Sequence, residues 1–137
     1  MKAILLATLL VAPAALAADP YIPTDAERAR WTMHDMKSWM IVFEAYKSDH
    51  KEYPHVSSVE DARAAGEPMY IRHAPMTDAW GHPYRIESNG QSFRIVSAGA
   101  DGIFQTDLSE KGTLKSFNDD AVATNEGKWL VRQWEFR

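Results

Sequence analysis

The sequence predicts an α+β domain in which one long N-terminal helix packs on a small antiparallel sheet of about four strands. Three observations support this fold class. Apolar residues recur at helical spacing over about residues 25–50, an Asn-Gly pair joins two alternating segments, and a second Gly-containing turn lies near the C-terminus. The 137 residues, 45% hydrophobic and 25% charged, have the composition of one globular domain.

The predicted helix has a clear N-terminal signal. Thr24 and Glu27 have the spacing of a capping box, and no Gly or Pro follows until Pro54. One helical face carries Thr32, Met36, Trp39, Met40, Phe43 and Tyr46. Trp31 and Ile41 lie off this face. They form either a second contact surface for a partner or a part of the helix that loops cover, and we favour the covering loops.

The strongest hairpin signal joins residues 84–88 to residues 91–96 through Asn89-Gly90, the pair preferred in a type I′ turn. A two-residue loop places Ile86 opposite Phe93. This register gathers apolar side chains on one face of the hairpin and leaves its two arginines on the other.

The rest of the sheet comes from a second, looser hairpin. Residues 121–124 pair with residues 128–136 around the three-residue turn 125–127, whose glycine is available for a left-handed position. Between the helix and the first hairpin, residues 54–83 are rich in proline and form mostly connection, with a short helix-forming stretch over residues 59–65.

Charge and cysteine content exclude several classes of function. The chain has 15 Lys and Arg against 19 Asp and Glu, a net charge of −4, so it lacks the basic surface that a nucleic-acid partner requires. It has no cysteine, which excludes thiol catalysis, disulfides and thiolate metal sites. Only oxygen and imidazole ligands are left for a metal.

The first residues have the pattern of a secretory signal. Lys2 precedes the apolar run of residues 3–12, and Pro13 and the small residues 14–17 follow it. We expect cleavage after residue 17, which leaves residues 18–137 as a single exported domain in the periplasm or outside the cell. The apolar run is shorter than the roughly 20 residues that a spanning helix needs. A retained N-terminal anchor is the alternative.

Several motifs, in order, resemble one family. They are Tyr46 with Tyr53-Pro54 after the helix, the run Asp78-Ala79-Trp80-Gly81-His82-Pro83-Tyr84, the Asn-Gly hairpin, and Ser97-Ala98-Gly99-Ala100-Asp101-Gly102. This order resembles the C-terminal globular domain of the major pseudopilin of type II secretion systems, over roughly residues 32–130. The resemblance implies the pseudopilin fold and a calcium-binding loop that begins at the Gly-x-Asp-Gly run. Without the family, Trp80 is best explained as a core residue.

The N-terminus departs from that family. Assembly-competent pseudopilins have a prepilin-peptidase site, with Gly before Phe and a Glu five residues into the mature chain, and then a long apolar helix. The sequence has none of these features. We therefore expect a soluble, exported domain that does not polymerise in the usual way.

The acidic loop is the candidate metal site. Carried over from the family residue by residue, the calcium ligands fall on Asp101 and on the acidic pair Asp119-Asp120, with the carbonyl of Ala98 as a main-chain candidate and Asp107 less secure. Calcium takes six to eight oxygen ligands, and it neutralises carboxylates that repel one another. The alternative is a solvated acidic loop. The loop has eighteen residues between Asp101 and Asp120 and lacks the family's run of glycines.

No catalytic motif stands out. The histidines are dispersed without metal-ligand spacing, and the sequence has neither a Gly-x-Ser-x-Gly elbow nor a phosphate-binding glycine loop. We therefore expect no enzymatic activity. Two functions are left open: an exported binding or structural module with an envelope or secretion-system protein as its partner, and a membrane-anchored subunit of a secretion or pilus-like filament.

Overall fold

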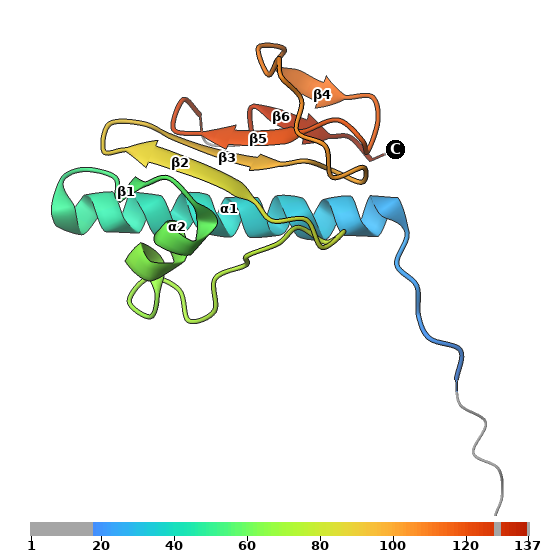
Figure 1. Cartoon of the computed structure of the whole chain (residues 1–137), viewed down its shortest axis with the longest axis horizontal. Helices are drawn as coiled ribbons and strands as arrows, with labels where there is room; N and C mark the ends of the chain where they lie inside the picture. Colours follow the sequence, from blue (N-terminus) through green and yellow to red (C-terminus); the bar gives the residue numbers. More distant parts are fainter. Residues whose placement is uncertain (1–17, 128–129, 137) are drawn as a thin grey trace, which may run out of the picture.

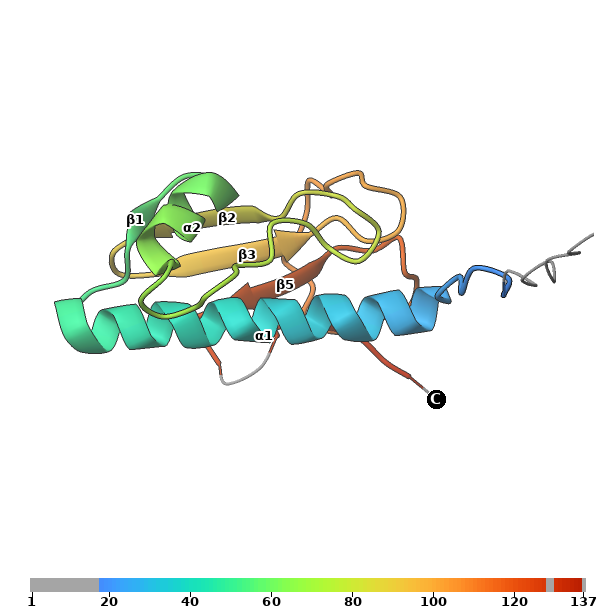
Figure 2. The same ribbon diagram turned by 90° about the horizontal axis from the view of Figure 1, so that it is seen from below.

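The computed structural model describes residues 18–127 and 130–136. Helix α1 (Asp25–His50) has the predicted bounds. The capping box is present: the Glu27 amide donates to Thr24 Oγ1 at 3.3 Å, and the Thr24 amide donates to Glu27 Oε2 at 2.9 Å. Helix α1 runs the length of the domain beneath the sheet (Figures 1 and 2).

The sheet has six strands in the order β1-β2-β3-β5-β6-β4. Every pairing is antiparallel except that of β4 with β6, which is parallel. The strands are β1 (His55–Val56), β2 (Arg85–Asn89), β3 (Phe93–Ser97), β4 (Gly112–Leu114), β5 (Ala121–Thr124) and β6 (Arg132–Trp134), and helix α2 (Val59–Gly66) lies beside β2. The fold class is confirmed, as is the short helix.

The predicted strand number was too low. The four expected strands are β2, β3, β5 and β6, and the two additional ones, β1 and β4, lie at the two edges of the sheet. They have two and three residues. Strands this short have no alternation of apolar and polar residues to detect, because only their neighbours define them.

The first hairpin has a different register from the predicted one. Ile86 lies opposite Ile95, and Phe93 lies opposite Ser88, which is a shift of two residues. The side chain of Asn89 causes the wider turn, because its Oδ1 accepts hydrogen bonds from the amides of Gln91 (3.0 Å) and Ser92 (2.9 Å). A shift of two keeps every side chain on its predicted face.

The core lies between α1 and the sheet. Phe43 packs edge to face on Trp39 and on Phe93, with ring centroids 6.1 and 5.2 Å apart, and Tyr53 packs on Phe93 at 5.0 Å. Trp80 is partly buried and packs on Trp134 at 5.5 Å, as expected of a core residue. The predicted helical face is therefore the one that meets the sheet.

The two apolar residues of α1 that lie off its main apolar face, Trp31 and Ile41, are exposed. Trp31 is 48% exposed and Ile41 is 69% exposed, so the interpretation that loops wrap this face was wrong. Helix α2 and the connection after it flank α1 on one side (Figures 1 and 2), and they leave open the face that carries Trp31 and Ile41. No helix among residues 18–127 and 130–136 is long and apolar enough to cross a membrane.

Replacing Ile95 by Ala is expected to lower the free energy of unfolding by about 2 to 5 kcal/mol, because Ile95 is fully buried on the helix side of the sheet. The matched control is Ile41→Ala on the open face of α1, with an expected change of at most about 0.5 kcal/mol. Urea denaturation followed by circular dichroism measures both values. Equal losses in the two variants would contradict the placement of the core.

Candidate functional site

The predicted metal residues lie on the long loop that joins β3 to β5. Asp101 lies near its start and is exposed, whereas Asp119 and Asp120 end it directly before β5. Asp120 is fully buried and Asp119 is partly buried. The loop therefore takes one acidic side chain out of water at the point where the chain re-enters the sheet.

The carboxylate of Asp120 is only half satisfied. Its Oδ2 accepts a hydrogen bond from the Gln105 amide at 2.9 Å, whereas its buried Oδ1 has no hydrogen-bond partner in the described part of the chain. Burial raises the pKa of Asp120, and the negative charge of Asp101 raises it further. The hydrogen bond from Gln105 and the positive charges of Arg132 and Arg85 act in the opposite direction. Burial has the largest effect, so the ionised form of Asp120 is disfavoured on balance.

The carboxylate of Asp119 turns toward the protein. Its Oδ2 accepts from the Ser116 amide at 3.2 Å, and its Oδ1 accepts from Gln105 Nε2 at 3.4 Å. The exposed Asp101 accepts a hydrogen bond from the Ile103 amide at 2.9 Å. Asp107, the less secure candidate, is also exposed, and it accepts from the Ser109 amide at 2.9 Å.

The structure brings these residues together only in part. The negative charge of Asp101 acts on Asp120 and raises its pKa, whereas the carboxylate of Asp119 is engaged by Ser116 and Gln105. Among residues 18–127 and 130–136, no three His, Cys, Asp or Glu side chains form a group that could hold a metal ion. The assignment of Asp101, Asp119 and Asp120 as ligands stays a prediction.

Main-chain oxygens add to the donor set. A Cβ atom on Gly99 would collide with the carbonyl oxygen of Phe117 and lie 3.0 Å from that of Asp119, and Gly99 has φ +70°. The Ala100 amide donates to the same Phe117 carbonyl at 2.8 Å. The two ends of the loop therefore touch where only glycine fits. Carbonyl and carboxylate oxygens are the ligand types that Ca²⁺ takes, so the loop offers donors of suitable chemistry, although no three acidic side chains of the described residues converge.

A second polar cluster fastens the start of the loop. Asp78, which is buried, accepts hydrogen bonds from Ser97 Oγ (2.8 Å) and from the amides of Trp80 and His82 (3.0 Å each). The ring nitrogen Nδ1 of His82 lies 2.9 Å from the Gly99 carbonyl oxygen. The motif that begins at Asp78 therefore holds β3 and the loop together.

This Ser-His-Asp combination is not a catalytic triad. A triad requires the histidine to lie between the nucleophile and the carboxylate. Here Ser97 donates directly to Asp78, and His82 Nδ1 faces a backbone carbonyl. Ser97 is also fully buried, so a substrate has no access to its oxygen.

Two residues that sequence analysis missed support the acidic pair. Gln105 contacts Asp119 and Asp120, and Arg132 on β6 contacts Gln105. Arg132 had a detectable signal, because Leu130, Arg132 and Trp134 alternate as one inward face of a strand. Gln105 lies in a segment without periodicity and had none.

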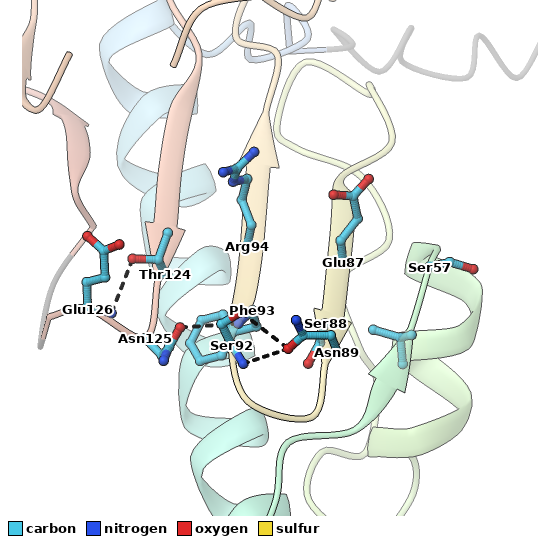
Figure 3. Close-up of a pocket in the computed structure, with 11 residues that line it drawn as sticks. Ser57, Glu87, Ser88, Asn89, Ser92, Phe93, Arg94, Thr124, Asn125 and Glu126 are labelled. Carbon is cyan, nitrogen blue, oxygen red and sulfur yellow. Dashed lines mark hydrogen bonds between the residues drawn. The ribbon is translucent and has the colours of Figure 1, made fainter. Parts of the chain in front are cut away.

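A shallow groove of about 500 Å³ lies on the sheet across β2, β3 and β5 (Figure 3). Glu87 and Arg94 stand opposite each other on β2 and β3, and Glu126 lies at the β5 end. Ser88 Oγ is buried there with no hydrogen-bond partner among the described residues. The mixed charge of this lining suits a contact with polar protein surface better than it suits an apolar ligand.

The long capped helix against a mostly antiparallel sheet, with an acidic loop before β5, defines the class of pseudopilin-like domains. The family model of the type II secretion system protein G matches residues 21–113, and the chain belongs to this family, that of the major pseudopilin. The curated proteins and the solved structures include no significant match to the chain. The matched region contains Asp101 and Gln105 but ends before Asp119 and Asp120.

Replacing Ser97 by Ala is expected to lower the free energy of unfolding by about 1 to 3 kcal/mol, because the buried carboxylate of Asp78 loses a hydrogen-bond donor. Ser48→Ala, at an exposed position of α1, is the control and should change it by at most about 0.5 kcal/mol. Urea denaturation measures both. A Ser97 variant as stable as the wild type would rule out this cluster as the fastening of the loop.

Proposed function

We propose that the protein is an exported, non-enzymatic, pseudopilin-like module that binds an envelope or secretion-system protein or serves as a structural component beside it. The module is residues 18–137 after removal of a signal peptide, and it acts in the periplasm or outside the cell. A calcium ion stabilises its acidic loop. The main observation behind this proposal is that a capping box ends α1 at its N-terminus.

The capping box supports an independent domain. Thr24 has an extended backbone (φ −71°, ψ 161°), and Glu27 folds back onto its amide. A helix that continues out of an apolar N-terminal segment has no use for such a cap, because its first amides would already be bonded within the helix. Pro20 and Pro23 reinforce the break. The predicted signal itself lies outside the described residues.

Membership of the protein G family favours a second candidate, a membrane-anchored subunit of a secretion filament. In that case the apolar residues near the N-terminus stay attached and hold the domain at the membrane. The two candidates differ in the N-terminus of the protein found in cells.

The non-enzymatic assignment is supported by the buried, directly paired Ser97 and Asp78 and by the mixed lining of the groove. Neither arrangement provides an accessible nucleophile next to a general base.

The calcium proposal is supported by Asp120, whose Oδ1 is buried without a hydrogen-bond partner among the described residues. Asp120 and Asp101 would hold the ion, with Asp119 and the carbonyl of Ala98 as the other ligands that the family implies. A bound divalent cation supplies positive charge that offsets the repulsion between these carboxylates. The ion would tie the loop to the start of β5.

Calcium is expected to stabilise the wild-type domain. With a dissociation constant near 10 μM, about 1 mM calcium would add roughly 2.7 kcal/mol to the free energy of unfolding. Thermal melts of residues 18–137 in calcium and in chelator measure the difference, and coincident curves would refute the site.

Variants of the loop residues test which side chains the stabilisation by calcium depends on. Asp101→Ala and Asp120→Asn are expected to abolish the difference between the two melts, since each removes a charged ligand. Asp19→Asn, outside the loop, is the matched control and should keep the full difference. Loss of the difference in the control as well would assign the calcium effect to general screening of charge.

The N-terminus of the protein recovered from cells distinguishes the module from the anchored subunit. We expect Edman or mass-spectrometric sequencing to find a chain that begins at Ala18 in the soluble envelope fraction. The reason is the small-residue site that follows the apolar run. A membrane-bound chain that still begins at Met1 would favour the anchored subunit.

A further inference from the structure

The side chain of Gln105 joins both residues of the acidic pair to the last strand. Its Oε1 accepts from the Asp120 amide at 2.9 Å and from Arg132 Nη2 at 2.9 Å, and its Nε2 donates to Asp119 Oδ1 at 3.4 Å. Its main-chain amide donates to Asp120 Oδ2 at 2.9 Å. One residue in the middle of the loop thus binds the side chains and backbone that end it.

The guanidinium of Arg132, which donates to Gln105, is buried and has a second hydrogen bond. Arg132 is 4% exposed, and its Nη1 donates to the Asp107 carbonyl at 3.3 Å. It forms no ion pair within 4.0 Å among residues 18–127 and 130–136, and its buried Nε has no hydrogen-bond partner among them. It lines a cavity of about 90 Å³ together with Gln105 and Asp119. A buried cation is costly, so its position next to the acidic pair indicates that it offsets their charge.

We propose that Gln105 is the positioning residue of the acidic loop. Held by Arg132, it keeps the loop closed without a metal ion and fixes Asp120 with Oδ2 engaged and Oδ1 free. A cation then meets an Asp120 side chain that is already held in place. Only this last step rests on the proposed calcium function, because the closure of the loop is a property of the chain alone.

The contacts of Gln105 affect calcium affinity through the entropy cost of ordering the loop. Strand β4 pairs with β6 with or without Gln105, but the part of the loop next to Asp120 is held less tightly when these contacts are lost, and the cost of ordering that part is subtracted from the affinity for the ion. With these contacts, that cost is met during folding. Removing the side chain is therefore expected to weaken both the closed loop and the binding of calcium.

The experiment compares wild type, Gln105→Ala and Gln105→Met in residues 18–137. Amide hydrogen exchange in chelator follows the Ala100 amide, which closes the loop onto Phe117 but does not contact Gln105. We expect exchange at Ala100 to rise at least about tenfold in both variants, the factor that corresponds to about 1.4 kcal/mol. The amide of Ile95 in β3 should stay protected, which shows that the sheet is intact.

Calorimetric titration with calcium chloride gives the second measurement, and the dissociation constant should rise about tenfold in both variants. The Met variant separates lost hydrogen bonds from lost volume, because it fills the space of glutamine without its polar atoms. Gln91→Ala, at an exposed position of the first hairpin turn, is the control and should leave both quantities at their wild-type values.

The outcomes separate this inference from the calcium proposal. Exchange at Ala100 within twofold of wild type in both variants would overturn the role of Gln105, whatever calcium does. Restoration by Met alone would also overturn it, because packing would then explain the effect. If wild type binds no calcium but the variants open the loop, the calcium proposal fails and the positioning role of Gln105 stands.

Discussion

The removal of Asp120 from water is the constraint on which the second half of the domain depends. Strand β5 lies in the middle of the sheet, and its first residue follows this fully buried carboxylate. A buried charge is tolerated only when other groups bond to it or balance it. The long loop before β5 supplies those groups, because it returns Gln105 to the start of the strand.

Hydrogen bonds and charge both act on this carboxylate. The Gln105 amide donates to Oδ2, and the positive charges of Arg132 and Arg85 favour the ionised form of Asp120. Its Oδ1 has no hydrogen-bond partner in the described residues, and burial and the charge of Asp101 disfavour ionisation. The free Oδ1 is the atom that connects the internal contacts of the loop to the proposed role of calcium.

Sequence analysis predicted the elements that depend on residues close together in the chain and missed the contacts between residues far apart in it. The cap, helix α1, helix α2 and the presence of the four central strands depend on signals within a few residues, and they were predicted correctly, although β6 spans only Arg132–Trp134 of the predicted residues 128–136. The hairpin register was wrong because Asn89 bonds to the turn amides, a side-chain contact that the Asn-Gly preference does not include. Gln105 meets Asp120 across 15 residues and Arg132 across 27, and no periodic pattern links such positions. Of the site, the acidic residues could be proposed from a family resemblance and the inward position of Arg132 from the alternation in its strand, whereas Gln105 had no signal.

The cap and the packing of α1 bear on whether the domain forms part of a filament. Its fold is complete around α1: the cap closes the helix at Thr24, and the inner face is filled by the sheet. The open face of α1, with Trp31 and Ile41 exposed, is the part of the helix that packing leaves unused. The capped helix and its filled inner face are the physical basis of the proposal that the domain acts as a module beside the secretion machinery.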